Sequence, residues 1–478
     1  MEQSADQIFA DLDGTLIRTD LFYEAVLQFV KQNPLNIFLV FAWLLKGRPF
    51  VKEKVAQAIE LNVESLPYET ELIDYLKEQR AQGRQVILAT AAHHSYAEKI
   101  ADFLGFFDAV IATRAGVNMK GARKLAAIQD FAGERRFTYA GDSSADRPIW
   151  KCARSNIFVN APMRDVRASE AGGKAEKHIQ SRPAVLRAFI REMRIHQYAK
   201  NALVLVPLFT SHSYQSLSAV ITALIAFLSF SICASGVYFL NDLLDVQADR
   251  KHPRKCKRPL ASGDLSIPVG VIGALGLPLV AFVLAIVFLP WLFVAVLAGY
   301  YLLTNIYSFY LKRVSTADVM TLAVLYTLRV VAGGAALGIS LSSWLMGFSI
   351  FAFVSLAYLK RYVEVAGLAD GVDKAAGRGY GAEDKEAMFS LGVANMSASV
   401  LVLALYINSE VVSGIYNSPQ LLWLLCLLML YWGNRLWIGA RRDKIADDPV
   451  VFAIRDRVSQ CVGICFILVT LLARYLTF

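Results

Sequence analysis

Asp11 and Asp13 follow a short apolar run near the start of the chain. At the end of a strand, residues two positions apart project to the same side, so Asp-Leu-Asp brings two carboxylates together. One carboxylate can attack phosphorus while the other exchanges a proton with the ester oxygen. Gly14 permits a tight turn after the strand. These residues predict phosphoryl-transfer chemistry.

Further polar residues that suit this chemistry occur later in the sequence. Asp142 and Asp146, in Gly-Asp-Ser-Ser-Ala-Asp, add two carboxylates of the kind that binds Mg²⁺. Thr90 ends a second apolar run and offers a hydroxyl to a phosphoryl oxygen. Lys124 can neutralise developing charge, and Lys120 is the alternative lysine.

The elements that must position these residues alternate between strand and helix. Short apolar runs that end in polar or small residues predict four strands, at 7–10, 85–89, 109–112 and 137–140. This order predicts an α/β domain with a parallel, doubly wound sheet, in which ligands bind at the carboxyl ends of the strands. Residues 18–75 are expected to form a helical cap. The apolar run 35–45 is too short to span a membrane, and we expect a cap helix or a membrane-surface helix.

A second acidic cluster closes a long apolar helix. Asp242, Asp245 and Asp249 are spaced i, i+3, i+7 and share one helical face with Asn241. Carboxylates beside hydrocarbon are costly unless a partner or a metal neutralises them. Clustered oxygens at the membrane edge suit Mg²⁺ that carries a diphosphate.

The composition places this second cluster in a membrane domain. The chain has 478 residues, 56% of them hydrophobic, and the long apolar stretches begin near residue 197. We expect nine membrane-spanning helices, at 197–213, 217–240, 267–289, 291–310, 317–338, 343–362, 387–407, 418–440 and 456–476. The domains are then 1–162 (hydrolase-like, cap 18–75), 163–190 (a charged linker) and 191–478 (membrane).

Charge distribution predicts the orientation. Lys and Arg concentrate in the loops 241–266, 311–316, 363–386 and 441–455, which predicts that these loops face the cytoplasm. With no signal peptide at the N-terminus, we expect a multi-pass inner-membrane protein with both sites cytoplasmic. The net charge of +9 therefore indicates basic cytoplasmic loops, with no nucleic-acid partner expected. The six scattered cysteines are expected to be buried thiols.

Residues 7–160 resemble the haloacid dehalogenase superfamily of phosphatases, through Asp-Leu-Asp-Gly-Thr and Gly-Asp-Ser-x-x-Asp. The resemblance implies a nucleophile at Asp11 and an acid/base at Asp13, with Thr90 and Lys124 completing the catalytic set. It implies an Mg²⁺ site among the acidic side chains, for which the candidate ligands are Asp11, Asp13, Asp142 and Asp146.

Residues 190–478 resemble the UbiA superfamily of intramembrane transferases, through Asn-Asp-x-x-Asp-x-x-x-Asp at 241–249. The second acidic motif of most members is weak here, because Glu364 and Asp370 are the only acids in 358–370. The stretches 194–201, 307–313, 327–334, 360–364 and 447–456 look like those of decaprenyl-phosphate phosphoribosyltransferases within the superfamily.

This resemblance implies that Asp242, Asp245 and Asp249 hold Mg²⁺ on the departing diphosphate of 5-phosphoribosyl 1-diphosphate. A polyprenyl phosphate in the bilayer would be the nucleophile. The residues expected to bind the substrates are Lys200, Asn201, Asn241, Arg258, Tyr307, Lys312, Arg329, Lys360, Arg361 and Glu364. Each lone basic residue also fits a simple positive-inside anchor, Arg329 least of all because it lies within an apolar span.

The two halves together predict a bifunctional enzyme. Phosphoribosyl transfer leaves a 5-phosphate on the lipid-linked ribose, and a tethered phosphatase would remove it to give polyprenyl-phosphoryl ribose. Two alternatives stay open: an aromatic prenyltransferase that uses a prenyl diphosphate, and a non-catalytic, regulatory hydrolase-like domain. The sequence is compatible with an oligomer and leaves the lipid chain length open.

Overall fold

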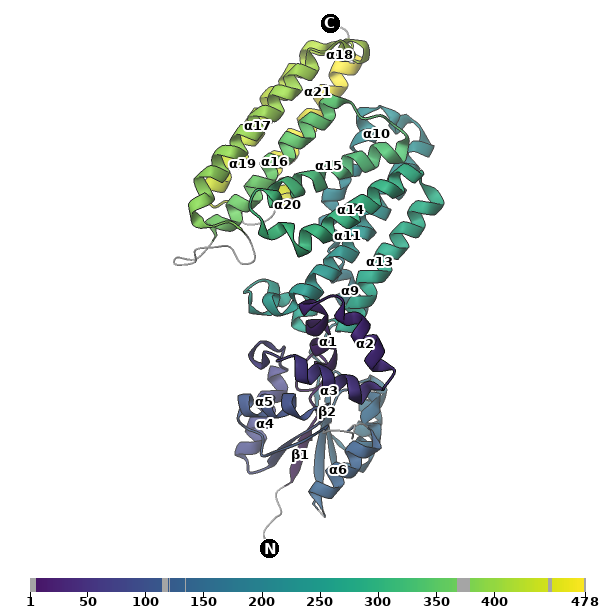
Figure 1. Ribbon diagram of the computed structural model, residues 1–478, viewed down its shortest axis with the longest axis vertical. Coiled ribbons are helices and arrows are strands. Elements are labelled where there is room, and N and C mark those ends of the chain that lie inside the picture. Colours follow the sequence, from purple (N-terminus) through teal and green to yellow (C-terminus); the bar gives the residue numbers. More distant parts are fainter. Residues whose placement is uncertain are drawn as a thin grey trace. The chain divides into compact units, whose positions relative to one another are not determined.

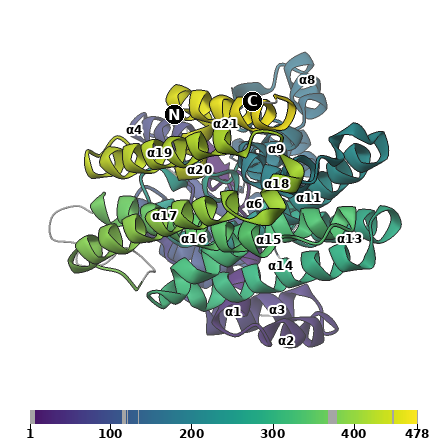
Figure 2. The same ribbon diagram turned by 90° about the horizontal axis from the view of Figure 1, so that it is seen from above.

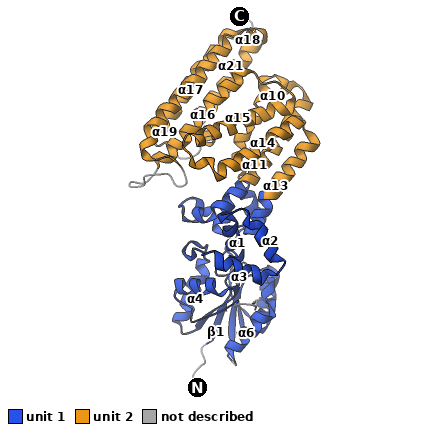
Figure 3. Cartoon of the chain, viewed as in Figure 1, with its two compact units in different colours: residues 1–193, 238–274 blue, residues 194–237, 275–478 orange. Residues whose placement is uncertain are grey.

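The computed structural model describes residues 6–113, 119, 121–133, 135–367, 379–445 and 449–476. The chain divides into two compact units, coloured separately in Figure 3. Unit 1 comprises residues 1–193 and 238–274, and unit 2 comprises residues 194–237 and 275–478.

Unit 1 contains a six-stranded parallel sheet of order β3-β2-β1-β4-β5-β6. Figure 1 labels two of its strands, β1 and β2. The four predicted strands are confirmed, and two further strands follow them. The strands are β1 (Gln7–Ala10), β2 (Gln85–His93), β3 (Ala109–Thr113), β4 (Phe137–Gly141), β5 (Ser155–Val159) and β6 (Ala175–Ile179). The direction in which successive strands are added to the sheet reverses at β1, with β2 on one side and β4 on the other. Sheets of this kind bind ligands in the crevice at such a point, beside the carboxyl end of the strand.

Alternate residues of each strand point to opposite faces of the sheet and belong to two separate cores. Helices cover both faces. Ile8, Val86 and Leu88 belong to one core and Phe9 and Ile87 to the other. The first core packs against α4 (Thr70–Ala81) and α5 (His94–Leu104), and the second against α6 (Ala122–Ala132), α7 (Arg147–Cys152) and α8 (Met163–Ala171).

The predicted linker 163–190 is wrong for most of its length. Residues 163–179 form α8 and β6, and β6 pairs in parallel with β5. The error arose because an edge strand needs apolar residues on one face only, and Ala-Glu-Lys-His-Ile reads as charged coil. The hydrolase-like fold therefore extends past residue 162, and α9 (Val185–Glu192) follows it.

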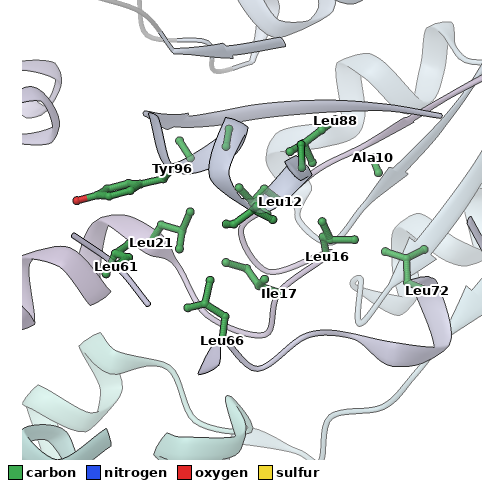
Figure 4. Close-up of a cluster of buried hydrophobic side chains, with 14 of the residues drawn as sticks. Ala10, Leu12, Leu16, Ile17, Leu21, Leu61, Leu66, Leu72, Leu88 and Tyr96 are labelled. Carbon is green, nitrogen blue, oxygen red and sulfur yellow. The ribbon is translucent and has the colours of Figure 1, made fainter. Parts of the chain in front are cut away.

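The loop after β1 rests on a buried apolar cluster (Figure 4). Leu12, Leu16, Ile17 and Leu21 each have at most 1% of their surface exposed. These residues are interspersed among the polar residues of the loop, so the packing that buries them also restricts the directions in which the polar side chains point.

The expected helical cap consists of α1 (Leu21–Gln32), α2 (Asn36–Leu44), α3 (Arg48–Ala58) and η1 (Val63–Ser65). Asp20 caps α1 by accepting a hydrogen bond from the Phe22 backbone N–H. The Trp43 ring stacks on Phe29 with centroids 5.3 Å apart, and this contact joins α2 to α1.

Eight helices among the described residues are long and apolar enough to span a membrane, which identifies a polytopic membrane protein. Helix α11 (Leu217–Lys251) and helix α13 (Ile267–Phe288) are joined by η5 (Lys255–Lys257) and α12 (Pro259–Ser262). The others are α14 (Trp291–Phe309), α15 (Ala317–Leu337), α16 (Ser343–Ala366), α17 (Lys385–Ile407), α19 (Trp423–Arg441) and α21 (Arg457–Tyr475). Helices α14, α15, α16 and α17 pack in succession (Figure 2).

Eight of the nine predicted spans correspond to these helices. Most of the ninth, 197–213, falls in η3 (Ile195–Leu205) and α10 (Val206–Thr210), each of which is shorter than the roughly 20 residues that a helical span needs. Pro207 lacks a backbone N–H and lies near the start of α10, where it favours a break between the two segments.

Candidate active sites

The carboxyl ends of β1 and β4 bring three acidic side chains together. Ala10 pairs with Ala140, and the Asp11 backbone N–H donates to the Ala140 carbonyl at 3.0 Å. Ligand oxygens of Asp11, Asp142 and Asp146 all lie within 4.8 Å of one another. Sequence spacing alone predicted this edge, because neighbouring parallel strands end on the same side of a sheet.

Lys124 faces this acidic group from α6. Its Nζ lies 2.7 Å from Asp11 Oδ2 and 4.0 Å from Asp146 Oδ1, and it donates to the Tyr139 hydroxyl at 2.8 Å. The side chain is buried, so its charge is little screened by water. Lys120, the alternative lysine, lies outside the described residues.

Asp13 is not one of the three grouped carboxylates, although the charge of Asp11 acts on it. Its Oδ1 accepts a hydrogen bond from the Leu21 backbone N–H at 2.9 Å, at the start of α1. Burial, together with the nearby Asp20, raises the pKa of Asp13 well above its ordinary value. A carboxyl with a raised pKa suits a general acid. The three-carboxylate group does not include Asp13, so the described geometry supports an acid/base role better than a metal-ligand role.

Gly14 allows Asp142 to approach the loop. Its φ is +82°, and a Cβ at this position would lie 2.3 Å from Asp142 Oδ2. Arg182 donates to the Gly14 carbonyl at 3.1 Å, and the Thr15 hydroxyl lies 3.4 Å from Asp142 Oδ1. Arg182 and Asp142 thus both contact the loop that follows β1.

Thr90 is fully buried in the second half of β2. Its Oγ1 accepts a hydrogen bond from the Ala92 backbone N–H at 3.0 Å, which leaves its own hydroxyl proton to be donated. No contact between Thr90 and the carboxylate group is seen among the described residues, so its expected role at a phosphoryl oxygen stays a prediction.

A small pocket connects Asp13 with the cap. Its cavity volume is about 10 Å³, and it is lined by Asp13, Leu21, Phe22, Ala25, Lys52, Val55, Ala92, His93 and Tyr96. Lys52 donates to the Ala91 carbonyl at 2.7 Å, and His93 Nε2 lies 3.0 Å from Glu53 Oε2. Sequence reasoning missed Lys52, because a lysine 39 residues from its strand partner gives no local signal.

The three grouped carboxylates fit a divalent cation. Burial, followed by the charges of Asp11 and Asp146, raises the pKa of Asp142 to about 7. Burial also raises the pKa of Asp11, although Lys124 opposes this change. Lys124 and Arg182 supply fewer positive charges than the three carboxylates carry, of which Asp146 is buried and Asp11 and Asp142 are half-buried. Hard carboxylate oxygens are the ligands Mg²⁺ prefers. A bound Mg²⁺ would neutralise the group and polarise a phosphoryl oxygen.

A prediction on pH follows from Asp142. Its folded-state pKa lies above the ordinary value of 3.8, so metal-free protein should lose stability as the pH rises from about 4 to about 7. Mg²⁺ needs the ionised form, so the rise in melting temperature on adding Mg²⁺ should be larger near pH 8 than near pH 5.5. Scanning fluorimetry of Asp142→Asn should show a much smaller difference between the two pH values. An equal Mg²⁺ effect at both pH values in the wild type would contradict the assignment.

The second acidic cluster has a different arrangement. Asp242 and Asp249 are buried, and one guanidinium nitrogen of Arg258 lies 3.0 Å from Asp242 Oδ1 and 2.6 Å from Asp249 Oδ2. Asn241 and Asp245 are half-buried on the same stretch of α11. In this arrangement the single positive charge of Arg258 is shared between two carboxylates that were expected to hold Mg²⁺. A metal-diphosphate would have to replace or share this guanidinium.

Ion pairs connect the cluster to the hydrolase-like fold within unit 1. Arg250, next to Asp249, forms a buried pair with Glu24 of α1. Arg18, in the loop after β1, contacts Glu69 at 3.0 Å and Asp264 at 3.4 Å. The Thr19 hydroxyl donates to Glu24 at 2.8 Å. The loop that follows Asp11 and Asp13 is thus bound to the residues that follow the acidic helix end.

In unit 2, the predicted residues Tyr307, Arg361 and Glu364 form one polar cluster with Asp318, which sequence reasoning missed. Arg361 is fully buried and pairs with Asp318 and Glu364. The Tyr307 hydroxyl accepts from Arg361 and donates to Asp318, each at 2.7 Å. Asp318 is fully buried at the start of α15, and no spacing rule linked it to Arg361, which is 43 residues away.

Arg329 and Asn201 also come together in unit 2. Arg329 Nε donates to Asn201 Oδ1 at 2.8 Å, and its guanidinium lies over the rings of Phe230, Tyr300 and Tyr326 at 5.1–5.4 Å. Most of its polar contacts are internal, so the described geometry supports positioning of Asn201 better than direct substrate contact. Of the predicted lysines, Lys200 is buried and Lys312 and Lys360 are half-buried. Asp370, Asp447 and Asp448 lie outside the described residues.

Comparison with known proteins identifies the family. The profile of the UbiA prenyltransferase family matches residues 203–456, more than half of the chain. The chain belongs to the UbiA prenyltransferase family. In this UbiA protein, residues 8–151 also match the haloacid dehalogenase-like hydrolase family.

Relatives of this UbiA protein agree with the two-part organisation. "Uncharacterized protein y4nM" of Sinorhizobium fredii is 35% identical over 95% of this chain and 89% of its own length. "Nodulation protein NoeC" of Azorhizobium caulinodans is 35% identical over 55% of this chain and 85% of its own length. "Decaprenyl-phosphate phosphoribosyltransferase" of Mycobacterium tuberculosis is 29% identical over 58% of this chain and 91% of its own length. The UbiA protein is thus a membrane transferase related to decaprenyl-phosphate phosphoribosyltransferases, with a phosphatase-like domain added.

Proposed function

We propose that this chain transfers 5-phosphoribosyl from 5-phosphoribosyl 1-diphosphate to a polyprenyl phosphate and then removes the 5-phosphate. The product would be polyprenyl-phosphoryl ribose. The proposal extends the resemblance to the Mycobacterium tuberculosis relative, whose name states the transferase half. The orientation proposed for both sites is cytoplasmic, where the basic loops are expected.

The observation that carries the coupled function is the buried ion pair between Glu24 and Arg250. Glu24 lies in α1, whose first residue, Leu21, donates its backbone N–H to Asp13. Arg250 directly follows Asp249 in the sequence. One compact unit thus contains the phosphatase-like loop and the acidic helix end. Such proximity would favour handing a lipid-linked product from one site to the other.

Phosphoribosyl transfer requires that the leaving diphosphate be stabilised. Mg²⁺ at Asp242, Asp245 and Asp249 would take up the charge that develops on it, and Arg258 would contact its oxygens. The anomeric carbon gains oxocarbenium character as the bond to the diphosphate breaks. The lipid phosphate oxygen is already anionic, so attack needs no strong general base.

At the phosphatase site, Asp11 would attack the 5-phosphate and Asp13 would protonate the departing ribose oxygen. Lys124 would balance the charge on Asp11 and on the phosphoryl group. Water would then release phosphate from the aspartyl intermediate, with Asp13 accepting its proton. The raised pKa of Asp13 supports the first of these proton transfers.

The test uses the full chain in membranes with purified polyprenyl phosphate and 5-phosphoribosyl 1-diphosphate labelled in the ribose. Wild type should give a lipid-linked ribose without the 5-phosphate, whereas Asp11→Asn should accumulate the 5-phosphorylated lipid. Equal retention of the 5-phosphate in both proteins would refute the coupling. Absence of label in the lipid fraction, with prenylated phenol formed from a prenyl diphosphate instead, would favour an aromatic prenyltransferase.

A further inference from the structure

Helix α2 of the cap carries an unusual number of exposed apolar side chains. Phe38 is 68% exposed, Phe41 60%, and Leu45, directly after the helix, 90%. Leu35, Leu39 and Leu44 are exposed as well. Water-soluble domains seldom leave such a contiguous apolar surface uncovered, and where they do it marks an interaction site.

Only a narrow part of α2 serves the core of unit 1. Val40 is buried, Trp43 stacks on Phe29, and Asn36 donates to the Phe29 carbonyl at 2.8 Å. The sequence Asn-Ile-Phe-Leu-Val-Phe-Ala-Trp-Leu is nevertheless apolar on every face. A helix of this type belongs in an apolar environment, whereas a surface helix would be polar on the side away from the core.

The charges around α2 identify the environment. No aspartate or glutamate occurs between Glu24 and Glu53. Lys31, Lys46 and Arg48 flank the helix and are exposed. Exposed apolar residues bordered by cations fit a bilayer with anionic headgroups, because the cations meet the headgroup phosphates while the apolar side chains enter the acyl region.

Continuity with the membrane-spanning helices supports the same conclusion. Within unit 1, Glu24 of α1 pairs with Arg250 near the end of α11, and Arg18 contacts Asp264 just before α13. Helix α2 packs on the other end of α1, at Phe29. Unit 1 therefore includes the ends of two spanning helices and the α2 surface (Figure 3).

We propose that α2 lies in the headgroup region of the membrane that α11 crosses, as a second, in-plane attachment of the hydrolase-like domain. Its nine residues are too few to span the bilayer and suit a position parallel to its surface. Leu35, Phe38, Phe41 and Leu45 enter the acyl boundary, and Lys31, Lys46 and Arg48 contact lipid phosphates.

The attachment has a consequence for substrate class, which rests on the proposed phosphatase function. The pocket beside Asp13 is lined by Leu21, Phe22 and Ala25 of α1, the helix on which α2 packs. A cap fixed at the membrane surface presents this pocket to phosphomonoesters carried on a lipid. We infer that the domain prefers a lipid-linked phosphate to a soluble sugar phosphate.

Photocrosslinking tests the membrane contact without relying on activity. p-Benzoylphenylalanine replaces Phe38 or Phe41 in the full chain, which is reconstituted in vesicles of phosphatidylcholine and phosphatidylglycerol. Matched controls carry it at Phe103 or Phe131, which are 47% and 45% exposed on α5 and α6. Mass spectrometry should find lipid adducts at Phe38 and Phe41, at least about tenfold above the controls. Adducts only to protein, including a second copy of the chain, would overturn the proposal, as would equal lipid adducts at all four positions.

A kinetic comparison tests the substrate preference. Phe38→Ser/Phe41→Ser should lower kcat/KM for a polyprenyl-linked ribose 5-phosphate by about tenfold or more and leave that for p-nitrophenyl phosphate unchanged. Phe38→Trp/Phe41→Trp should retain activity on the lipid, since tryptophan favours the membrane interface. An equal loss on both substrates would overturn the preference. Lipid adducts without hydrolysis of either phosphate by the wild type would refute the proposed phosphatase function and leave the membrane contact established.

Discussion

Asp11→Asn is expected to lower hydrolysis of the lipid-linked 5-phosphate by about 10³-fold or more, because the amide is a poor nucleophile toward phosphorus. The variant also removes the charge that Lys124 Nζ contacts at 2.7 Å. Phosphate release from the membrane-embedded full chain, measured with excess Mg²⁺, gives the rate. Phosphoribosyl transfer by the same preparation should stay near the wild-type rate.

Asp130→Asn is the matched control for this result. Asp130 is exposed on α6, the helix that carries Lys124, and the substitution makes the same change of charge and size. It should hydrolyse the substrate at the wild-type rate. Phosphatase activity that survives in Asp11→Asn would show that the nucleophile is elsewhere, and equal losses in both variants would indicate an effect on folding.

Asp249→Asn is expected to lower phosphoribosyl transfer to the lipid by about 10³-fold, because the departing diphosphate loses part of the Mg²⁺ site that neutralises it. In the structure Asp249 Oδ2 contacts Arg258 at 2.6 Å, so the substitution also weakens the hold on that guanidinium. Label from ribose-labelled 5-phosphoribosyl 1-diphosphate in the lipid fraction measures the rate. Hydrolysis of a supplied lipid-linked 5-phosphate should change little.

Asp443→Asn serves as its control. Asp443 is exposed after α19 with φ near +54°, a conformation that asparagine adopts readily. Transfer at the wild-type rate in Asp249→Asn would remove the acidic helix end from the mechanism. Equal impairment of Asp249→Asn and Asp443→Asn would point to a general loss of folded protein.

The hydrolase-like site was predictable because its geometry follows from strand order. Asp11 and Asp142 each come directly after a strand, and the pairing of Ala10 with Ala140 brings them together. Lys124 was less certain from the sequence, since its approach to Asp11 depends on how α6 packs against the sheet. Pattern alone could not choose between it and Lys120.

The parts that sequence reasoning missed depend on contacts between distant residues. Strand β6 has too few apolar residues to be recognised before its pairing with β5 is known. Asp318 has no acidic neighbour in a motif, and only the packing of α15 against α16 brings it to Arg361. Arg258 was predicted to contact substrate, but its double contact with Asp242 and Asp249 was not foreseen.

The Glu24–Arg250 pair bears on how the molecule can be dissected. A fragment that stops at residue 193 would lose Arg250, the buried partner of Glu24, together with the rest of residues 238–274 that belong to the same compact unit. It would also expose to water the part of α1 that these residues cover. The boundary between the water-facing and lipid-facing parts of the sequence thus does not coincide with the boundary between the two compact units, and we expect a hydrolase-like fragment that retains residues 238–274 to be the more stable one.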